Sequence, residues 1–243
     1  MKVITIIQAR MGSTRLPGKV LKDLGGESVL ARAVKRVRRT KLAGEVVIAT
    51  TNNSADSEIV AECERIAANV FRGDENDVLD RYYQCALSFG ADAVVRITSD
   101  CPLIDSDVTD KTVHSFLDRR PDYASNTLER KYPRGLDTEV MTMEALTVAW
   151  QDARKPYQRA HVTPYLYENP GRFRLLPVCG FRDYSHYRWT LDTDEDLALL
   201  RTLYERMNNR DDFSWLDLVK LLEQEPELAD MNRGVMQKAL AEG

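Results

Sequence analysis

Short apolar runs recur at intervals along the first part of this chain. Residues 3–7, 46–50 and 93–97 are rich in Val, Ile and Ala. Runs this short and this rich in β-branched side chains predict strands that are buried on both faces, as in a parallel sheet.

Amphipathic stretches between these runs predict helices. Apolar side chains recur at helical spacing over residues 59–67, where Ser54 is the expected cap, and over residues 77–89, which Gly90 follows. Gly often follows a helix because it adopts the left-handed backbone at low cost. The alternation of strand and helix predicts an α/β fold with a doubly wound, mostly parallel sheet and right-handed crossovers.

The alternation weakens after residue 107. Residues of about 121–187 mix short extended pieces with Pro and Gly turns, which indicates a small inserted lobe rather than another βα unit. A short strand is expected at residues 188–192, then a helix from Asp194 and a helical tail over about 212–243. Because no repeat interrupts the chain, we expect one domain over residues 1–243 that includes this lobe and this tail.

The composition is that of an ordinary globular protein, with 43% hydrophobic residues, 30% charged residues and a net charge of −4. This balance argues against nucleic-acid binding, which needs a clustered basic surface. The four cysteines show no C-x-x-C pair and no zinc spacing, so reduced thiols are expected. No run suits a signal peptide or reaches the roughly 20 apolar residues that span a bilayer, so we expect a cytoplasmic protein without a membrane partner.

A basic loop, residues 9–19, follows the first expected strand. It contains Arg10, Arg15 and Lys19 together with Gly12 and Gly18. Open α/β sheets bind ligands beyond the carboxyl ends of their strands, and such cations and glycines suit an anion. The loop therefore predicts a polyphosphate site, although it has neither Walker A spacing nor a G-x-G-x-x-G pattern. A basic surface loop without a ligand is the alternative.

Two aspartates also follow expected strands. Asp100 comes directly after the run at 93–97, and Asp192 ends the strand expected at 188–192. Both carboxylates should reach the sheet edge that carries the basic loop. Since two carboxylates would repel a polyphosphate, a Mg²⁺ ion between them is the expected solution. Asp192 could instead cap the following helix.

These motifs together resemble the cytidylyltransferases that activate 3-deoxy-manno-octulosonate and acylneuraminate, and most of all their spore-coat polysaccharide biosynthesis protein F branch. The resemblance spans residues 3 to about 205. The motifs that carry it are Ala9-Arg10, Ser13-Thr14-Arg15-Leu16-Pro17-Gly18-Lys19, Asp100-Cys101-Pro102 and Asp192-Thr193-Asp194-Glu195-Asp196-Leu197.

The resemblance implies a nucleotide-diphospho-sugar transferase fold of the GT-A-like, Rossmann type, and a Mg²⁺-dependent cytidylyltransferase with CTP and a sugar acid as substrates. It implies Arg10, Lys19, Asp100 and Asp192 as catalytic residues, the last two on the metal. The nucleotide-binding positions that it implies are Gln8, Ala9, Arg10, Gly12, Ser13, Arg15, Lys19 and Arg72. A homodimer and a role in surface polysaccharide synthesis are further implications.

The acceptor pocket is expected in the middle region. Arg134, Asp137 and Glu139 share one turn, where acids could accept from sugar hydroxyls and Arg134 could pair with a carboxylate or phosphate. His161 starts an aromatic stretch and could face the same pocket. The alternatives are an exposed charged turn and a packing histidine.

Other functions share this fold class, because a fold does not fix an activity. A sugar-1-phosphate nucleotidyltransferase or a GT-A-type glycosyltransferase is one alternative. A catalytically silent nucleotide-binding module is another. The combination of Arg10, Lys19, Asp100 and Asp192 favours an enzyme.

Overall fold

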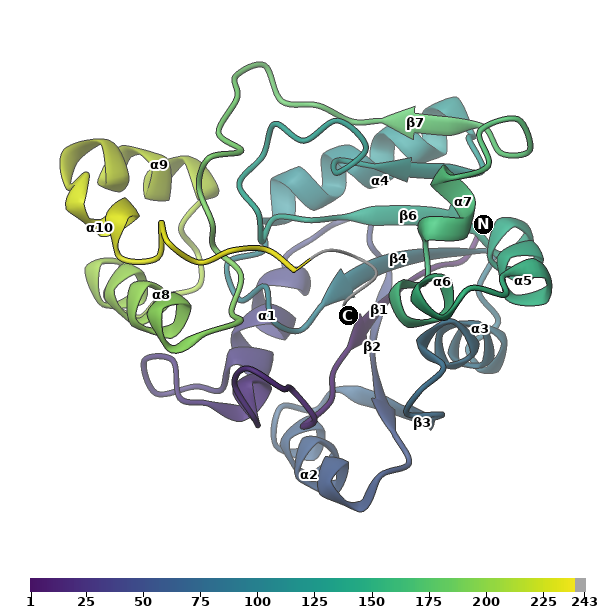
Figure 1. Ribbon diagram of the computed structural model, residues 1–243, viewed down its shortest axis with the longest axis horizontal. Helices are drawn as coiled ribbons and strands as arrows, with labels where there is room; N and C mark the ends of the chain where they lie inside the picture. The colour runs from purple at the N-terminus through teal and green to yellow at the C-terminus, as the bar shows by residue number, and fades with distance from the viewer. Residues whose placement is uncertain (239–243) are drawn as a thin grey trace.

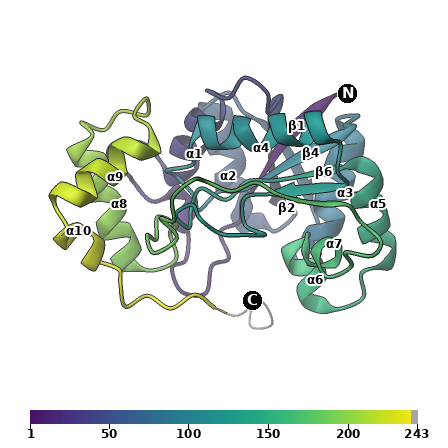
Figure 2. The same ribbon diagram turned by 90° about the horizontal axis from the view of Figure 1, so that it is seen from above.

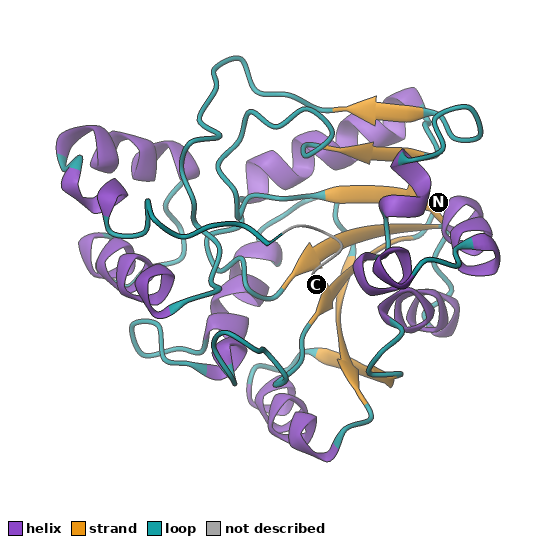
Figure 3. Ribbon diagram, viewed as in Figure 1, coloured by secondary structure: helices purple, strands orange, loops and turns teal. Residues whose placement is uncertain are grey.

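Seven strands form one mixed sheet in the computed structural model, which describes residues 1–238 (Figure 1, Figure 3). Across the sheet they lie in the order β3-β2-β1-β4-β6-β5-β7. In chain order they are β1 (Val3–Gln8), β2 (Glu45–Thr51), β3 (Asn69–Gly73), β4 (Ala93–Thr98), β5 (Tyr123–Ser125), β6 (Glu139–Thr142) and β7 (Leu175–Pro177). The first four are mutually parallel, and β6 is antiparallel to β4 and β5. The predicted doubly wound, mostly parallel sheet is confirmed.

Helices cover both faces of the sheet (Figure 2). On one face lie α1 (Val29–Val37), α2 (Ser57–Arg65) and α4 (Ser106–Arg119), and on the other lie α3 (Val78–Ser88), α5 (Met143–Asp152), α6 (Pro156–His161) and α7 (Pro164–Tyr167). Successive side chains of a strand point to opposite faces. Ile6 therefore packs with α3, whereas Ile7 packs with α1 and α2.

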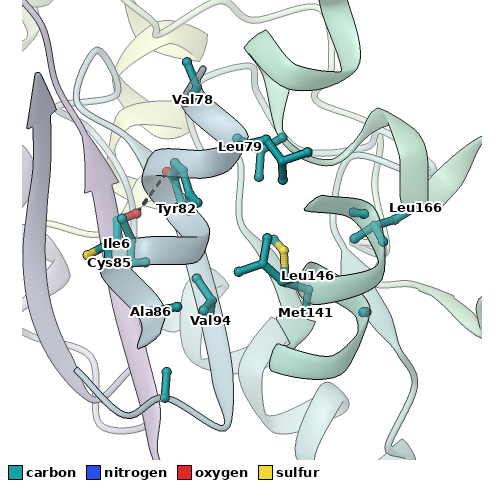
Figure 4. Packing of buried hydrophobic residues seen from close by; sticks show 14 of the residues in the cluster. Ile6, Val78, Leu79, Tyr82, Cys85, Ala86, Val94, Met141, Leu146 and Leu166 are labelled. Atoms are coloured by element: carbon teal, nitrogen blue, oxygen red, sulfur yellow. Dashed lines mark hydrogen bonds between the residues drawn. The ribbon is translucent and has the colours of Figure 1, made fainter. Parts of the chain in front are cut away.

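The core under α3 shows how the strands are held in place (Figure 4). Leu79, Tyr82 and Ala86 of this helix pack against Ile6 and Val94, and all five side chains are fully buried. The Tyr82 hydroxyl donates to the Ile6 carbonyl oxygen at 3.2 Å, which satisfies a polar group inside an apolar cluster. Together these contacts fix β1 and β4, whose carboxyl ends precede the basic loop and Asp100.

The sequence missed or misplaced several elements. Strand β3 and helix α1 were not anticipated, because β3 is only partly buried and α1 carries polar side chains on its inner face. The strand expected at residues 188–192 is wrong, since these residues form only an isolated bridge between Arg134 and Arg188. The expected Ser54 cap is also wrong. Ser54 lies in a short 3-10 turn, Ser54–Asp56, before α2, and the Asn53 side chain caps that turn. The strands expected in an inserted lobe, β5 to β7, join the main sheet.

The C-terminal helices pack beside the sheet rather than over it (Figure 1). Apolar side chains of α8 (Asp194–Arg206), α9 (Trp215–Gln224) and α10 (Glu227–Asp230) form a third cluster around Trp189. Beyond α10, residues 231–238 are not helical and return toward the basic loop. The tail predicted over 212–243 is thus helical only as far as Asp230 among its described residues, and residues 239–243 lie outside the description. Among the helices within residues 1–238, none has the length and apolar content to cross a membrane.

Candidate active site

The basic loop is anchored to the end of β2 by one buried carboxylate. The Met11 N–H donates to Asp56 Oδ1 at 2.8 Å, and the Thr50 and Thr51 hydroxyls donate to Asp56 Oδ2 at 3.0 and 2.5 Å. Gly18 closes the loop, because its N–H donates to the Met11 carbonyl at 3.0 Å with a φ of 66°. A side chain would strain this left-handed position, which explains glycine there.

Lys19 follows Gly18 directly and points between the two predicted metal ligands. Its ammonium lies 2.8 Å from Asp100 Oδ2 and 2.8 Å from Asp192 Oδ1. It also donates to the Leu191 carbonyl at 2.6 Å. Two aspartates that lie 81 and 173 positions away from Lys19 in the sequence thus meet at its ammonium nitrogen.

Asp192 reaches this point although its segment is not a strand. The Trp189 N–H donates to the Arg134 carbonyl at 2.7 Å, and the Leu191 N–H donates to the Asp100 carbonyl at 2.8 Å. Gly135 permits this close packing, because a Cβ there would lie 2.7 Å from the Trp189 carbonyl. Two short backbone contacts therefore replace the expected strand ladder. Thr193, not Asp192, caps α8, so the capping alternative for Asp192 is wrong.

Asp192 is surrounded by cations. Its Oδ2 lies 2.9 Å from an Arg15 nitrogen and 2.7 Å from an Arg188 nitrogen, in addition to the Lys19 contact at Oδ1. Burial alone would raise the pKa of Asp192, but these cations lower it to about 2. Burial likewise opposes ionisation of Asp100, yet Lys19 and the Thr98 hydroxyl hold its pKa below the usual value. Both carboxylates are therefore ionised at neutral pH.

The residues present fit a hard divalent cation. Two ionised carboxylates and the Leu191 carbonyl converge on one positively charged atom, the Lys19 nitrogen. Oxygen ligands from one or two carboxylates, completed by water and substrate phosphates, are typical of Mg²⁺. Within residues 1–238, no cluster of three or more Asp, Glu, His or Cys side chains offers a metal site built from side chains alone.

The remaining nucleotide-binding candidates differ in how they are engaged. Arg10 is exposed and has no side-chain partner among residues 1–238, whereas Arg72 donates to the carbonyls of Thr51 and Asn53 at 2.8 Å each. Ser13 is half-buried, Gly12 is exposed, and the Ala9 N–H donates to the Ala49 carbonyl of β2 at 3.2 Å. Arg10 is thus the cation of this loop most available to a ligand.

A profile of the cytidylyltransferase family matches residues 4–225. The chain is also 34% identical over 234 residues to the spore coat polysaccharide biosynthesis protein SpsF of Bacillus subtilis, covering 93% of this chain and 96% of the relative. The chain belongs to the cytidylyltransferase family. It is therefore a nucleotidyltransferase, and the resemblance seen in its motifs is confirmed.

Solved structures agree with this assignment. A cytidylyltransferase from Leptospira borgpetersenii serovar Hardjo-bovis superposes with a TM-score of 0.91 at 35% identity, covering 98% of this chain and 100% of that one. A CMP:2-keto-3-deoxy-manno-octonic acid synthetase, solved in complex with CTP, superposes with a TM-score of 0.67 at 18% identity, covering 85% of this chain and 100% of that one. The second likeness shows the fold alone.

The predicted acceptor residues of this cytidylyltransferase fall into two groups. Glu139 is buried on β6, where it pairs with Arg96 and accepts from the hydroxyls of Tyr123 at 2.5 Å and Thr163 at 2.6 Å. His161 is half-buried two residues before Thr163. The Arg96 guanidinium also donates to Gln8 Oε1 at 3.1 Å, which links this group to the end of β1.

Asp137 and Arg134 form the second group. Both Asp137 oxygens accept from Arg130, at 2.6 and 2.8 Å, while Arg134 is half-buried near the same pair. Burial and the neighbouring Arg130 lower the pKa of Arg134. Among residues 1–238, no hydrogen bond or ion pair joins these residues to Glu139. The side chains of the turn at 133–139 therefore belong to two separate groups of interactions.

Sequence reasoning missed Arg188 and the C-terminal segment. Arg188 donates to both Asp192 and Asp196, and it also donates to Gln237 Oε1 at 2.8 Å. Its spacing of four residues from Asp192 was the available signal. The C-terminal segment borders a cavity of about 390 Å³ together with Arg15 and Thr193, and no local pattern indicates this long-range contact.

Proposed function

We propose that this protein is a Mg²⁺-dependent cytidylyltransferase that transfers CMP from CTP to a sugar acid and releases pyrophosphate, as a step in surface polysaccharide synthesis. The observation that carries the proposal is the convergence of Asp100, Asp192 and Lys19 beside a loop whose Arg10 has no side-chain partner among residues 1–238. The similarity to SpsF supports the polysaccharide role. The CTP complex of a protein with this fold supports the choice of nucleotide.

The chain's own residues would chiefly position and neutralise the triphosphate. Arg10, Arg15 and Lys19 lie on one loop, and we place the β- and γ-phosphates among them. Asp100 and Asp192 would hold Mg²⁺, which supplies charge stabilisation to the phosphoryl oxygens when bound. Attack at the α-phosphorus then needs alignment and electrostatic stabilisation rather than a covalent enzyme intermediate.

We place the acceptor between the two groups described above. Arg134 and His161 are the proposed contacts to its carboxylate and hydroxyls, and Asp137 orients Arg130 toward the same region. Glu139 has both oxygens occupied, so we propose that it acts indirectly, by holding Arg96 beside Gln8. This is a supporting role and not direct acceptor binding.

Pyrophosphate release tests the proposal. The purified protein is assayed with Mg²⁺ and each of CTP, UTP, ATP and GTP, against sugar acids and sugar-1-phosphates. We expect release with CTP and a sugar acid only. Release with a sugar-1-phosphate would instead indicate a sugar-1-phosphate nucleotidyltransferase. Tight CTP binding without pyrophosphate release would indicate a catalytically silent binding module, provided that the same acceptors are substrates of an active relative.

A further inference from the structure

Each N–H donor of the Lys19 ammonium has a hydrogen-bond acceptor at the proposed metal position. An ammonium group has three N–H donors. Those of Lys19 meet Asp100 Oδ2 at 2.8 Å, Asp192 Oδ1 at 2.8 Å and the Leu191 carbonyl at 2.6 Å. Its side chain is only 11% exposed, so the contacts are shielded from solvent. One oxygen of each aspartate and the Leu191 carbonyl, all of which would suit a divalent cation, are thus bonded to Lys19.

The two carboxylates depend on Lys19 to different extents. Asp192 has Arg15 and Arg188 as further cationic partners. Asp100 has no other cation among residues 1–238, and its other oxygen accepts from the Thr98 hydroxyl at 2.6 Å. If Lys19 moved away, Asp100 would be left as a partly buried charge without a counter-ion. Such a charge is costly and strongly favours a new cation.

We propose that Lys19 and a divalent metal ion compete for the same oxygens of Asp100 and Asp192. Two cations cannot occupy one point, so the metal enters this site when Lys19 leaves it. A triphosphate gives Lys19 another anion to bind, and the long side chain is attached next to the loop that would hold the phosphates. Nucleotide binding therefore releases the metal site. The inference rests on the proposed function, because that function supplies the triphosphate.

Manganese alone, without nucleotide, tests the competition. Mn²⁺ binding is measured by electron paramagnetic resonance on the full chain for the wild type, for Lys19→Met and for Lys41→Met, a matched change at an exposed lysine far from the aspartates in sequence. We expect Lys19→Met to bind Mn²⁺ about tenfold more tightly than the wild type, since a unit charge has left the carboxylates. Lys41→Met should match the wild type.

Two further variants identify the site. Lys19→Arg keeps the charge and should bind Mn²⁺ as weakly as the wild type. The double variant Lys19→Met with Asp100→Asn should lose the gain. Equal affinities in the wild type and in a folded Lys19→Met, or a gain that survives Asp100→Asn, would overturn the proposal. Pyrophosphate release is measured separately on the wild type. A wild type inactive with CTP and sugar acids, together with a gain in Mn²⁺ binding by Lys19→Met, would refute the proposed function and leave the competition standing.

Discussion

Two charged networks lie along the same sheet, and they are built differently. At the carboxyl ends of β1 and β4, three cations share two aspartates, and Asp100 is 24% exposed. Between β4 and β6, Arg96 forms an ion pair with Glu139, and the Glu139 side chain is 8% exposed. The hydroxyls of Tyr123 and Thr163 donate to the other oxygen of Glu139. A cation of the shared network can turn to a ligand while the aspartates keep other partners. Arg96 could bind a ligand only by giving up its ion pair with Glu139.

The comparison assigns different costs to the two networks. Neutralising one member of a buried pair leaves its partner without a counter-ion, which lowers the free energy of unfolding. Neutralising one member of the shared network leaves other charges that compensate in part, so we expect a smaller loss of stability there and a larger loss of activity.

The largest effect is expected for Asp100→Asn. The change removes a metal charge without core volume, and Lys19 keeps its contact with Asp192. We expect kcat for pyrophosphate release to fall by about a hundredfold to a thousandfold, the usual cost of one preorganised charge-stabilising group. Thermal unfolding should stay within a few degrees of the wild type. Asp107→Asn, at an exposed carboxylate on α4, is the control. Near-normal turnover at saturating Mg²⁺ would contradict the metal assignment.

Glu139→Gln should reverse that pattern. It leaves Arg96 buried without its carboxylate, so we expect a loss of about 3 kcal/mol in the free energy of unfolding, measured by urea titration. Adding Arg96→Met should recover part of the loss, because the orphaned charge is removed. Asp137→Asn breaks a more exposed pair with Arg130 and should cost about 1 kcal/mol or less. Equal costs for the two pairs would show that burial does not set the cost of breaking them.

Local patterns predicted the parts of the site that follow regular strands. The apolar runs before the basic loop and before Asp100 are strong signals, and the parallel sheet brings their ends together. The same reasoning placed Asp192 correctly for a wrong reason, since no strand precedes it and Gly135 allows the contact instead. The sequence did not predict that both Glu139 oxygens have partners within the protein, because these partners come from β4, β5 and the turn before α7. Such pairing depends on tertiary packing rather than on local sequence.

A smaller effect is expected for Arg188→Lys. The guanidinium spans Asp192 and Asp196 at 2.7 and 2.9 Å, and the compact ammonium of lysine cannot hold both. Asp192 should then be less well oriented, so we expect kcat to fall about tenfold, which corresponds to about 1.4 kcal/mol. The free energy of unfolding should change little. Arg201→Lys, on the exposed side of α8, is the control. An unchanged kcat would show that the remaining cations suffice to orient Asp192.

The last prediction concerns a pH dependence of stability. The pKa of Asp192 is lowered to about 2 in the folded protein, against about 3.9 for an unperturbed aspartate. A carboxylate with a lowered pKa stabilises the fold above its unfolded pKa and loses that contribution as the pH falls toward its folded pKa. Asp192→Asn lacks the contribution at every pH. The gap between the wild type and this variant should therefore be full at pH 5 and close toward pH 2.

We expect this gap to be about 1–2 kcal/mol at pH 5, because partial exposure to solvent screens the three cations around Asp192. Urea titrations of both proteins at pH 5, 4, 3 and 2 measure it. Asp107→Asn should show no such convergence. A gap that stays constant down to pH 2 would mean that Asp192 stabilises the fold through hydrogen bonds that asparagine cannot replace, and not through charges shared with Arg15, Lys19 and Arg188.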